Sequence, residues 1–254
     1  MSPWALYPAF IACVAVSTCI QNLTGFAFGL ILLGLVSTFD LASVADAGNA
    51  ATALTLVNAF AYFRVHKLQP GWRVVRPAML PSLAGVAVGV LLLMWLSENA
   101  VHLLRGMLGL AILACAVALL IDAKPRTTLS APGAFAFVGS LSGLMGGLFS
   151  SAGPPLVYHM YRQPLPRDLV RQCLILMFAV NQVLRLLLVL GSGRFTWHSV
   201  WLSLAAVPAV YVVTRLQHRY MPPIGMRLTK CISSGLLILA GGSLVTSFIR
   251  SALR

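Results

Sequence analysis

Acidic residues are scarce in this sequence: aspartate and glutamate number five among 254 residues, and all charged residues together make up 9%. A soluble domain carries about 25% charged residues, so the composition excludes an ordinary soluble protein. HExxH, P-loop, GxGxxG and paired-carboxylate patterns are absent. The five cysteines fall in apolar segments without metal-ligand spacing, which is typical of small packed side chains. We therefore expect no metal, no cofactor and no enzymatic activity.

Hydrophobic residues are abundant at 59%, and the formal net charge is +13. Together these values predict an all-α integral membrane protein, because Lys and Arg mark the cytoplasmic loops of such proteins. We therefore expect the lipid bilayer, and not nucleic acid, to be the partner of this chain. The first residues, MSPWALYPAF, lack a basic stretch, which favours retained membrane structure over a cleaved signal peptide.

Six apolar runs have the length of single membrane spans. Each is close to the ~20 residues that a hydrocarbon layer of ~30 Å requires, and short polar or basic loops separate them. The predicted spans are 42–64, 76–96, 100–121, 169–191, 196–214 and 227–248.

Two further apolar segments, 3–36 and 133–160, do not fit a straight span. The first would be about 50 Å long as one helix and is interrupted by QNLTGFAFG. The second contains GGLFSSAGPPLVYHM, whose prolines, glycines and serines break or loosen a helix. Freed backbone groups need new partners in lipid. Each segment is therefore either a kinked span or a hairpin that re-enters on the same side.

The same order, a broken segment followed by three spans, occurs in residues 1–122 and again in 123–254. Similar residues recur at offsets of 122 to 125 positions, which supports a duplicated architecture. The matched pairs are Gly29 with Gly153, Asn58 with Asn181, Trp72 with Trp197, and Arg105 with Arg227.

The distribution of arginine and lysine favours re-entrant segments. If both broken segments crossed the membrane, the two sides would carry nine and eight basic residues. If both re-enter, one side carries thirteen and the other four. Only the second arrangement follows the positive-inside rule. It predicts three full spans per half, halves inverted relative to each other, and both termini outside the cytoplasm.

The stretches GFAFGLILLGLV and GLMGGLFSSAGPPLVYHMYRQPLPRDLVRQCLILMFAVNQ resemble the TauE/SafE family of membrane transporters. In that family, once per half, a glycine-rich break precedes an apolar, proline-containing stretch, a basic loop and a helix. The resemblance covers nearly the whole chain and implies transport of small anions, notably sulfite, organosulfonates and related sulfur oxyanions. This sequence departs from the pattern with Ser150, Ser151 and Ala152 where further glycines are common, and with Gly34 where proline can occur.

Arg185 lies midway along the apolar segment LMFAVNQVLRLLLVLGSG. A charge at the bilayer centre costs at least about 2.5 kcal/mol, so it normally faces a partner or a wet cavity. Asn181 lies one turn earlier on the same face, and Gln182 is its neighbour. Guanidinium donors match oxyanions, so we predict that these three residues bind the substrate. The alternatives are a structural arginine held by backbone carbonyls or Asp46, or one that snorkels to the interface.

The breaks supply further candidate donors. An interrupted helix exposes N–H groups that can bind an anion, and glycine allows close approach of the backbone. Asn58 corresponds to Asn181 in the repeat. The alternative is that the glycines permit tight helix packing and that the polar residues, Thr52 and Thr55 among them, form interhelical hydrogen bonds. The remaining predicted site residues are Ser150, Ser151, Gly153, Asn22, Thr24, Gly25 and Asn58.

We thus expect a secondary transporter that moves sulfite, organosulfonates or related carboxylates across a bacterial-type inner membrane by alternating access. An anion channel on the same scaffold, a membrane-embedded hydrolase using Ser150 or Ser151 with His159, and a structural subunit are the rival hypotheses. The coupling ion, a proton or sodium, stays open, with Asp46 as a candidate proton carrier. A homodimer also stays open.

Overall fold

The computed structural model of this chain describes residues 3–24, 27–65, 71–120, 126–151, 154–220 and 226–252. These residues form ten α-helices and no strand, which confirms the all-α class. The helices are α1 (Pro3–Thr24), α2 (Phe28–Thr38), α3 (Val44–Val65), α4 (Trp72–Asn99), α5 (Val101–Leu120), α6 (Pro132–Phe149), α7 (Pro154–Tyr161), α8 (Arg167–Gly191), α9 (Trp197–Tyr220) and α10 (Met226–Ala252).

Both segments that were predicted to be broken are divided into two helices. α1 and α2 share the first, and α6 and α7 share the second. Ala27 and Ser150 border the breaks with φ values of 76° and 54°, a left-handed conformation that is uncommon for residues other than glycine. Pro154 and Pro155 begin α7, because proline is tolerated in the first helical turn, where its missing N–H has no partner to lose.

Five helices are long and apolar enough to cross a membrane: α4, α5, α6, α8 and α9. Four of them coincide with predicted spans. The predicted span 42–64 forms helix α3 but does not reach this hydropathy, the span 227–248 forms α10, whose described apolar stretch is Ser234–Thr246, and α6 reaches it although it was assigned to a broken segment. α3 falls short because it carries a buried polar series: Asn49, Thr52, Thr55 and Asn58.

Glycines bring α4 and α6 into backbone contact. A Cβ atom on Gly143 would lie 1.9 Å from the carbonyl oxygen of Ser82, and one on Gly147 would lie 2.4 Å from that of Val86. Gly89 on the α4 side is equally confined, since its Cβ would lie 2.4 Å from a carbonyl oxygen of α6. Small residues four positions apart are typical of closely packed membrane helices. This packing fixes the position of the C-terminal end of α6, where the break begins.

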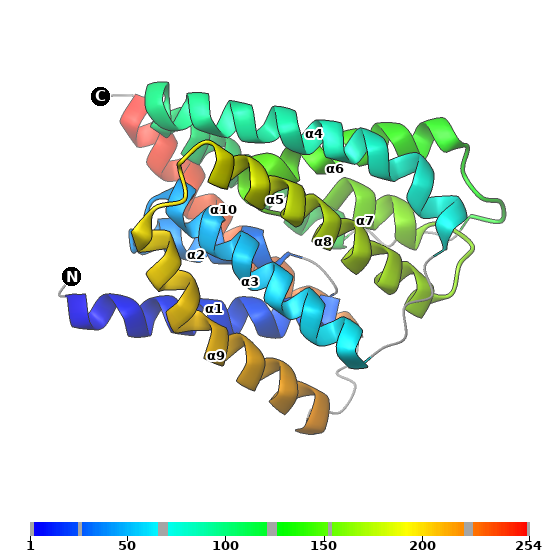
Figure 1. Cartoon of the computed structure of the whole chain (residues 1–254), viewed down its shortest axis with the longest axis horizontal. Coiled ribbons are helices and arrows are strands. Elements are labelled where there is room, and N and C mark those ends of the chain that lie inside the picture. Colours follow the sequence, from blue (N-terminus) through cyan, green and yellow to red (C-terminus); the bar gives the residue numbers. More distant parts are fainter. Residues whose placement is uncertain are drawn as a thin grey trace.

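The helices extend between two ends of the molecule, and α1 begins at the same end at which α10 finishes (Figure 1). We call the other end the basic end, because described arginines gather there at the ends of α3, α4, α6, α7, α8 and α9. They are Arg64, Arg73, Arg76, Arg126, Arg162, Arg171, Arg215 and Arg219.

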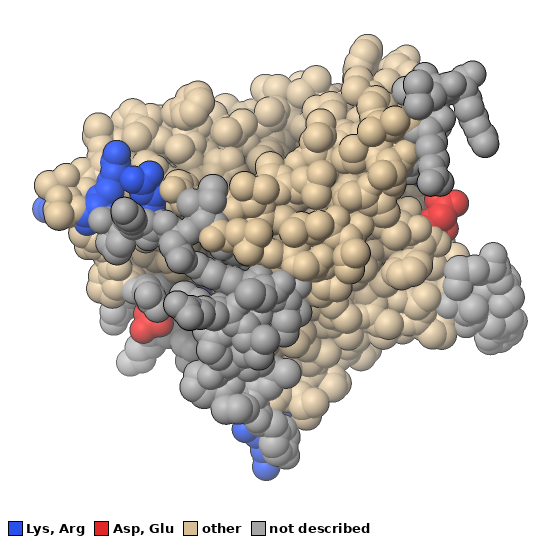
Figure 2. Space-filling view, turned by 180° about the vertical axis from the view of Figure 1, so that it is seen from behind, with Lys and Arg blue, Asp and Glu red and all other residues tan. Residues whose placement is uncertain are grey.

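Uncharged residues cover the middle of the broad face drawn in Figure 2, and the charged side chains visible there lie toward its edges. Large apolar side chains are correspondingly exposed on the helices, including Leu80, Phe137 and Trp201. An apolar belt with charges beyond it matches a protein surrounded by lipid.

Candidate functional site

The Arg185 side chain lies inside the protein, between α8, α6 and α3, with 1% of its surface exposed. Its Nε donates a hydrogen bond to the carbonyl oxygen of Gly147 at 3.0 Å. Its Nη1 donates to the carbonyl oxygen of Gly48 at 3.2 Å and to the hydroxyl of Thr52. One guanidinium therefore joins three helices at the second break.

These contacts follow from the local structure. Gly147 lies in the last turn of α6, where carbonyl groups lack intrahelical partners and carry partial negative charge. Backbone carbonyls thus hold the arginine, as one of the sequence-based alternatives stated. The alternative prediction, that Asp46 pairs with Arg185, was wrong. The carboxylate of Asp46 accepts hydrogen bonds from the hydroxyls of Ser43, Thr196 and Ser199 at 2.6 to 2.8 Å.

Ser150 connects the break to the same cluster. Its hydroxyl donates to the carbonyl oxygen of Gly48 at 2.6 Å and lies 3.2 Å from the hydroxyl of Thr52. The carbonyl oxygen of Ser150 accepts a hydrogen bond from the amide of Gln182. The first turn of α2 touches this point too, because a Cβ atom on Gly29 would lie 2.6 Å from the Ser150 carbonyl oxygen. The two breaks therefore meet beside Arg185.

The cluster retains hydrogen-bonding capacity. Among the described residues, Arg185 Nη2 has no hydrogen-bond partner although it is buried. Gly48 packs closely against it, since a Cβ atom there would stand only 3.1 Å from Nη2. A buried, unpaired cationic donor is costly, so a ligand that accepts a hydrogen bond and carries negative charge would relieve the cost.

The other predicted site residues are divided. The Asn181 amide donates to the hydroxyl of Ser82 on α4 at 2.7 Å, one turn from Arg185. Ser151 is buried directly after Ser150. Gly25 and Gly153 lie outside the described residues, as does the side chain of Thr24.

Asn22 and Asn58 belong to a second polar cluster, toward the basic end. The Asn22 amide donates to Thr214 and Gln217 on α9, each at 3.1 Å, and the Asn58 amide donates to the side-chain oxygen of Asn22 at 3.3 Å. Arg171 Nη2 donates to the carbonyl oxygen of Asn22 at 2.6 Å. The sequence-based prediction placed these asparagines in one site with Arg185, and the structure separates them from it.

Sequence reasoning missed Gly48 and Arg171 as neighbours of the predicted site, and it considered Thr52 as an interhelical hydrogen-bonding residue, which its bond with Arg185 confirms. Gly48 and Thr52 are one turn apart on one face of α3, which was a readable signal. Arg171 follows a basic loop in the sequence, and its reach to α1 becomes visible only in three dimensions.

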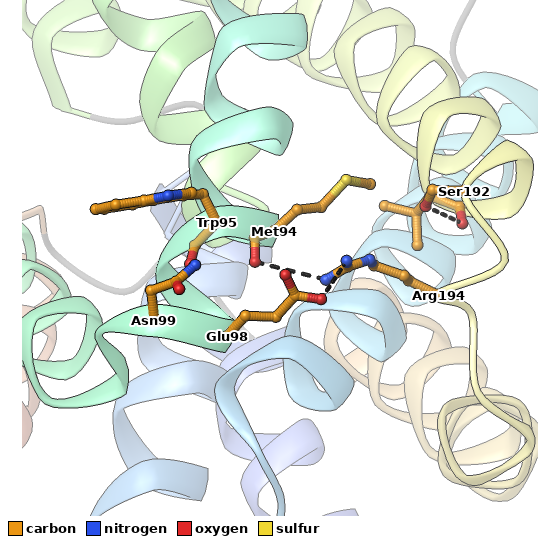
Figure 3. Close-up of polar contacts among 7 residues, drawn as sticks. Met94, Trp95, Glu98, Asn99, Ser192 and Arg194 are labelled. Atoms are coloured by element: carbon orange, nitrogen blue, oxygen red, sulfur yellow. Dashed lines mark hydrogen bonds and ion pairs between the residues drawn. The ribbon is translucent and has the colours of Figure 1, made fainter.

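A third set of contacts lies at the end opposite to the basic end (Figure 3). Arg194, after α8, forms an ion pair with Glu98 at the end of α4 and approaches the carbonyl oxygen of Met94. The backbone carbonyl of Arg194 accepts a hydrogen bond from Asn49 of α3 at 3.1 Å. These contacts tie α3, α4 and α8 together beyond the Arg185 cluster.

The sequence matches the profile of the family described as sulfite exporter TauE/SafE over residues 9–244. A protein of Cupriavidus necator named probable sulfite/organosulfonate exporter TauE is 34% identical over 234 residues, which cover 92% of this chain and 91% of that protein. No solved structure matches the chain. The matched region includes both helix breaks and Arg185.

Proposed function

The chain belongs to the sulfite exporter TauE/SafE family of membrane transporters, which are not enzymes, and from this premise we propose that it carries sulfite, organosulfonates or related small anions across the membrane by alternating access. The observation that carries the proposal is the buried guanidinium of Arg185 at the meeting point of the two breaks, with Nη2 unpaired. A sulfite or sulfonate oxygen would accept from Nη2, and the anion would neutralise the charge.

The pairing of helices supports two structurally related halves, α1–α5 and α6–α10. In these halves, α1 to α5 correspond in order to α6 to α10. When each helix is exchanged for its counterpart, the contact of α4 with α6 becomes the contact of α9 with α1. The same exchange converts α4 with α8 into α9 with α3, and α5 with α7 into α10 with α2. The contacts of α3 with α8 and of α5 with α10 are converted into themselves. A pseudo-twofold axis through the last two contacts accounts for this pattern.

The relative direction of the central helices supports inversion of the halves. Thr52 contacts Arg185, whereas Tyr62, later on α3, lies under the guanidinium of Arg171, earlier on α8. The equivalent helices α3 and α8 are therefore antiparallel, as the inverted repeats of many secondary transporters require.

Contacts at the second broken segment support re-entry. The N–H of Arg126, before α6, donates to the carbonyl oxygen of Arg162, after α7, at 2.7 Å. Gln163 likewise bonds the hydroxyl of Ser130 at 3.0 Å. The segment thus begins and finishes at the basic end. By the positive-inside rule, we assign that end to the cytoplasm of the inner membrane and both termini to the other side.

The hydrolase alternative loses its support. The Ser150 hydroxyl donates to Gly48, and the His159 ring packs edge-on against Phe135 with centroids 4.8 Å apart. No hydrogen bond joins serine to histidine among the described residues.

The proposal is tested by flux of radiolabelled sulfite into proteoliposomes. Arg185→Gln removes the positive charge and keeps a polar side chain. We expect sulfite flux to fall by about 10- to 100-fold, which corresponds to the free energy of one or two charge-assisted hydrogen bonds. Arg215→Gln, at an exposed position on α9, is the matched control and should transport normally. Unlabelled sulfoacetate, lactate and sulfate, added as competitors, rank the substrates. Full sulfite flux in Arg185→Gln would contradict the proposal.

A further inference from the structure

Two arginines of α8 make equivalent contacts with the two broken segments. Arg171 and Arg185 are fourteen residues apart, about 21 Å along the helix. Arg185 donates to the carbonyl of Gly147, two residues before the end of α6, and Arg171 donates to that of Asn22, two residues before the end of α1. Both cations therefore occupy the C-terminal end of a helix that stops inside the protein.

Arg171 borders a pocket. The pocket is narrow, with a volume of about 20 Å³, and α1, α3 and α8 form its walls. Its floor is buried and its rim is half-buried, so it can be reached from the surface at the basic end. The lining residues are Gln21, Asn22, Thr55, Asn58, Ala59, Tyr62, Arg171, Ile175 and Phe178.

Three buried polar atoms that line this pocket have no partner among the described residues, the acceptor Oε1 of Gln21 and two donors. Thr55 is 6% exposed, and its hydroxyl has no hydrogen-bond partner among the described residues. The Nε of Arg171 is also buried and unpaired. A threonine hydroxyl without a partner is expensive to bury, which indicates a ligand or water at this point.

Arg171 forms no ion pair within the described part of the chain, although the carboxylate of Asp168 lies one turn earlier on α8. The two ion pairs found among the described residues join Arg105 to Asp40 and Arg194 to Glu98. Arg171 instead stacks over the ring of Tyr62, with its Cζ 5.5 Å from the centroid. A guanidinium without an ion pair beside an unpaired hydroxyl is a set of groups suited to an oxyanion, and the amide of Asn58, which already donates one hydrogen bond to Asn22, lies in the same pocket.

We propose that this pocket is a second anion station, which binds one sulfite- or sulfonate-type oxyanion through Arg171, Thr55 and Asn58 at the basic end. The inference rests on the proposed function, because it takes the same substrate class to travel between this pocket and Arg185. The two stations share α3 and α8, so the anion passes along their interface, where Thr55 stands one turn from Thr52.

Equilibrium binding of radiolabelled sulfite to the purified full-length protein tests the proposal. The wild-type protein is expected to bind two anions per chain. Arg171→Gln and Arg185→Gln should each bind one, and the double variant none. Arg215→Gln, the exposed control, should bind two. Two anions bound by Arg171→Gln, or a single wild-type site lost only in Arg185→Gln, would overturn the second station and leave the proposed function standing.

Failure of the proposed function has a different signature. If Arg185→Gln binds as many anions as wild type and Arg171→Gln binds fewer, the pocket is an anion site and the assignment of Arg185 is wrong. Because Arg171→Gln also removes the bond to α1, Thr55→Val serves as a second variant that breaks no bond of the structure. It should weaken one of the two sites by about three- to tenfold, the value of one hydrogen bond. Two sites of unchanged affinity in Thr55→Val would overturn the role of the pocket.

Discussion

The two arginines of α8 hold the same kind of carbonyl group in opposite surroundings. Arg185 is enclosed, with bonds to α6 and α3, whereas Arg171 is half-buried and borders a pocket. The enclosure of Arg185 depends on α6, whose glycines allow it to pack closely against α4. In contrast, no residue of α4 or α6 lines the pocket at Arg171. The comparison thus sets a pocket toward the basic end against an enclosed arginine, beyond which an exposed ion pair of Glu98 with Arg194 joins α4 to the end of α8.

Both clusters also show how a chain with five acidic residues accommodates buried cations. Carbonyl groups at the C-terminal ends of interrupted helices replace carboxylates as partners. A carbonyl compensates only part of a positive charge. Each arginine therefore keeps the capacity to attract an anion, which a carboxylate partner would have removed.

The largest expected effect comes from separating α6 from α4. Gly143→Ala would place a Cβ 1.9 Å from the Ser82 carbonyl oxygen, so the helices must move apart. We expect a loss of about 3 kcal/mol or more in the free energy of unfolding, measured by denaturation in detergent. Gly133→Ala is the control, because nothing lies within 4 Å of its Cβ, and it should be neutral or stabilising. A normally stable Gly143→Ala protein would contradict the close packing.

Replacing each arginine by lysine tests whether the cluster around Arg185 depends more on guanidinium geometry than the cluster around Arg171. Lysine keeps the charge but cannot reach Gly147, Gly48 and Thr52 together. Arg185→Lys should lower sulfite flux about tenfold, equivalent to about 1.4 kcal/mol. Arg171→Lys loses one carbonyl bond and ring stacking, so we expect about a threefold decrease. Equal effects at the two positions would remove the distinction.

Two threonines one turn apart on α3 provide a matched pair for stability. Thr52→Val deletes a hydroxyl that accepts from Arg185, so the protein should lose about 1–3 kcal/mol. Thr55→Val deletes a buried hydroxyl without a described partner, and the protein should be unchanged or slightly more stable. Thermal unfolding of both variants in the same detergent gives the comparison. A greater loss for Thr55→Val would show that its hydroxyl has a structural partner.

The smallest effect is expected at the ion pair opposite to the basic end. Glu98→Gln weakens an ion pair whose side chains are 42% and 60% exposed, so the free energy of unfolding should fall by only about 0.2–1 kcal/mol. The loss should shrink further at high salt, because exposed pairs are screened. Salt-independent destabilisation beyond that range would mean that the pair joins α4 to the end of α8 more strongly than its exposure indicates.

Local physical chemistry allowed much of the fold to be predicted. The six predicted spans coincide with α3, α4, α5, α8, α9 and α10, with ends that differ by up to six residues, and the glycine, serine and proline clusters located both breaks. The other four described helices, α1, α2, α6 and α7, occupy the two predicted broken segments, and α2 and α7 extend past them by two residues and one residue. The sequence-based prediction counted α3 among the apolar spans, but its hydropathy is too low for this. Its asparagines and threonines are buried inside the protein, and a count of apolar residues does not show on which face the polar residues lie.

The site was predictable only in part. A charge within an apolar helix identified Arg185 from sequence. Its partners were not identifiable, because Gly147 and Gly48 contribute backbone carbonyls that any residue possesses. The sequence also could not separate Asn22 and Asn58 from Ser150, since that distinction depends on where α1 ends relative to α6. The glycines at 139, 143 and 147 were a readable signal for the packing of α6.

Counterflow tests the central claim, carriage of an anion between two alternately open sides, most directly. Proteoliposomes are loaded with unlabelled sulfite and diluted into a trace of labelled sulfite. A carrier that binds the anion at Arg185 exchanges one for the other, so the label should accumulate transiently above its equilibrium level in wild type and not in Arg185→Gln. Label that rises only to its equilibrium level in the wild-type protein would contradict alternating access and indicate a channel.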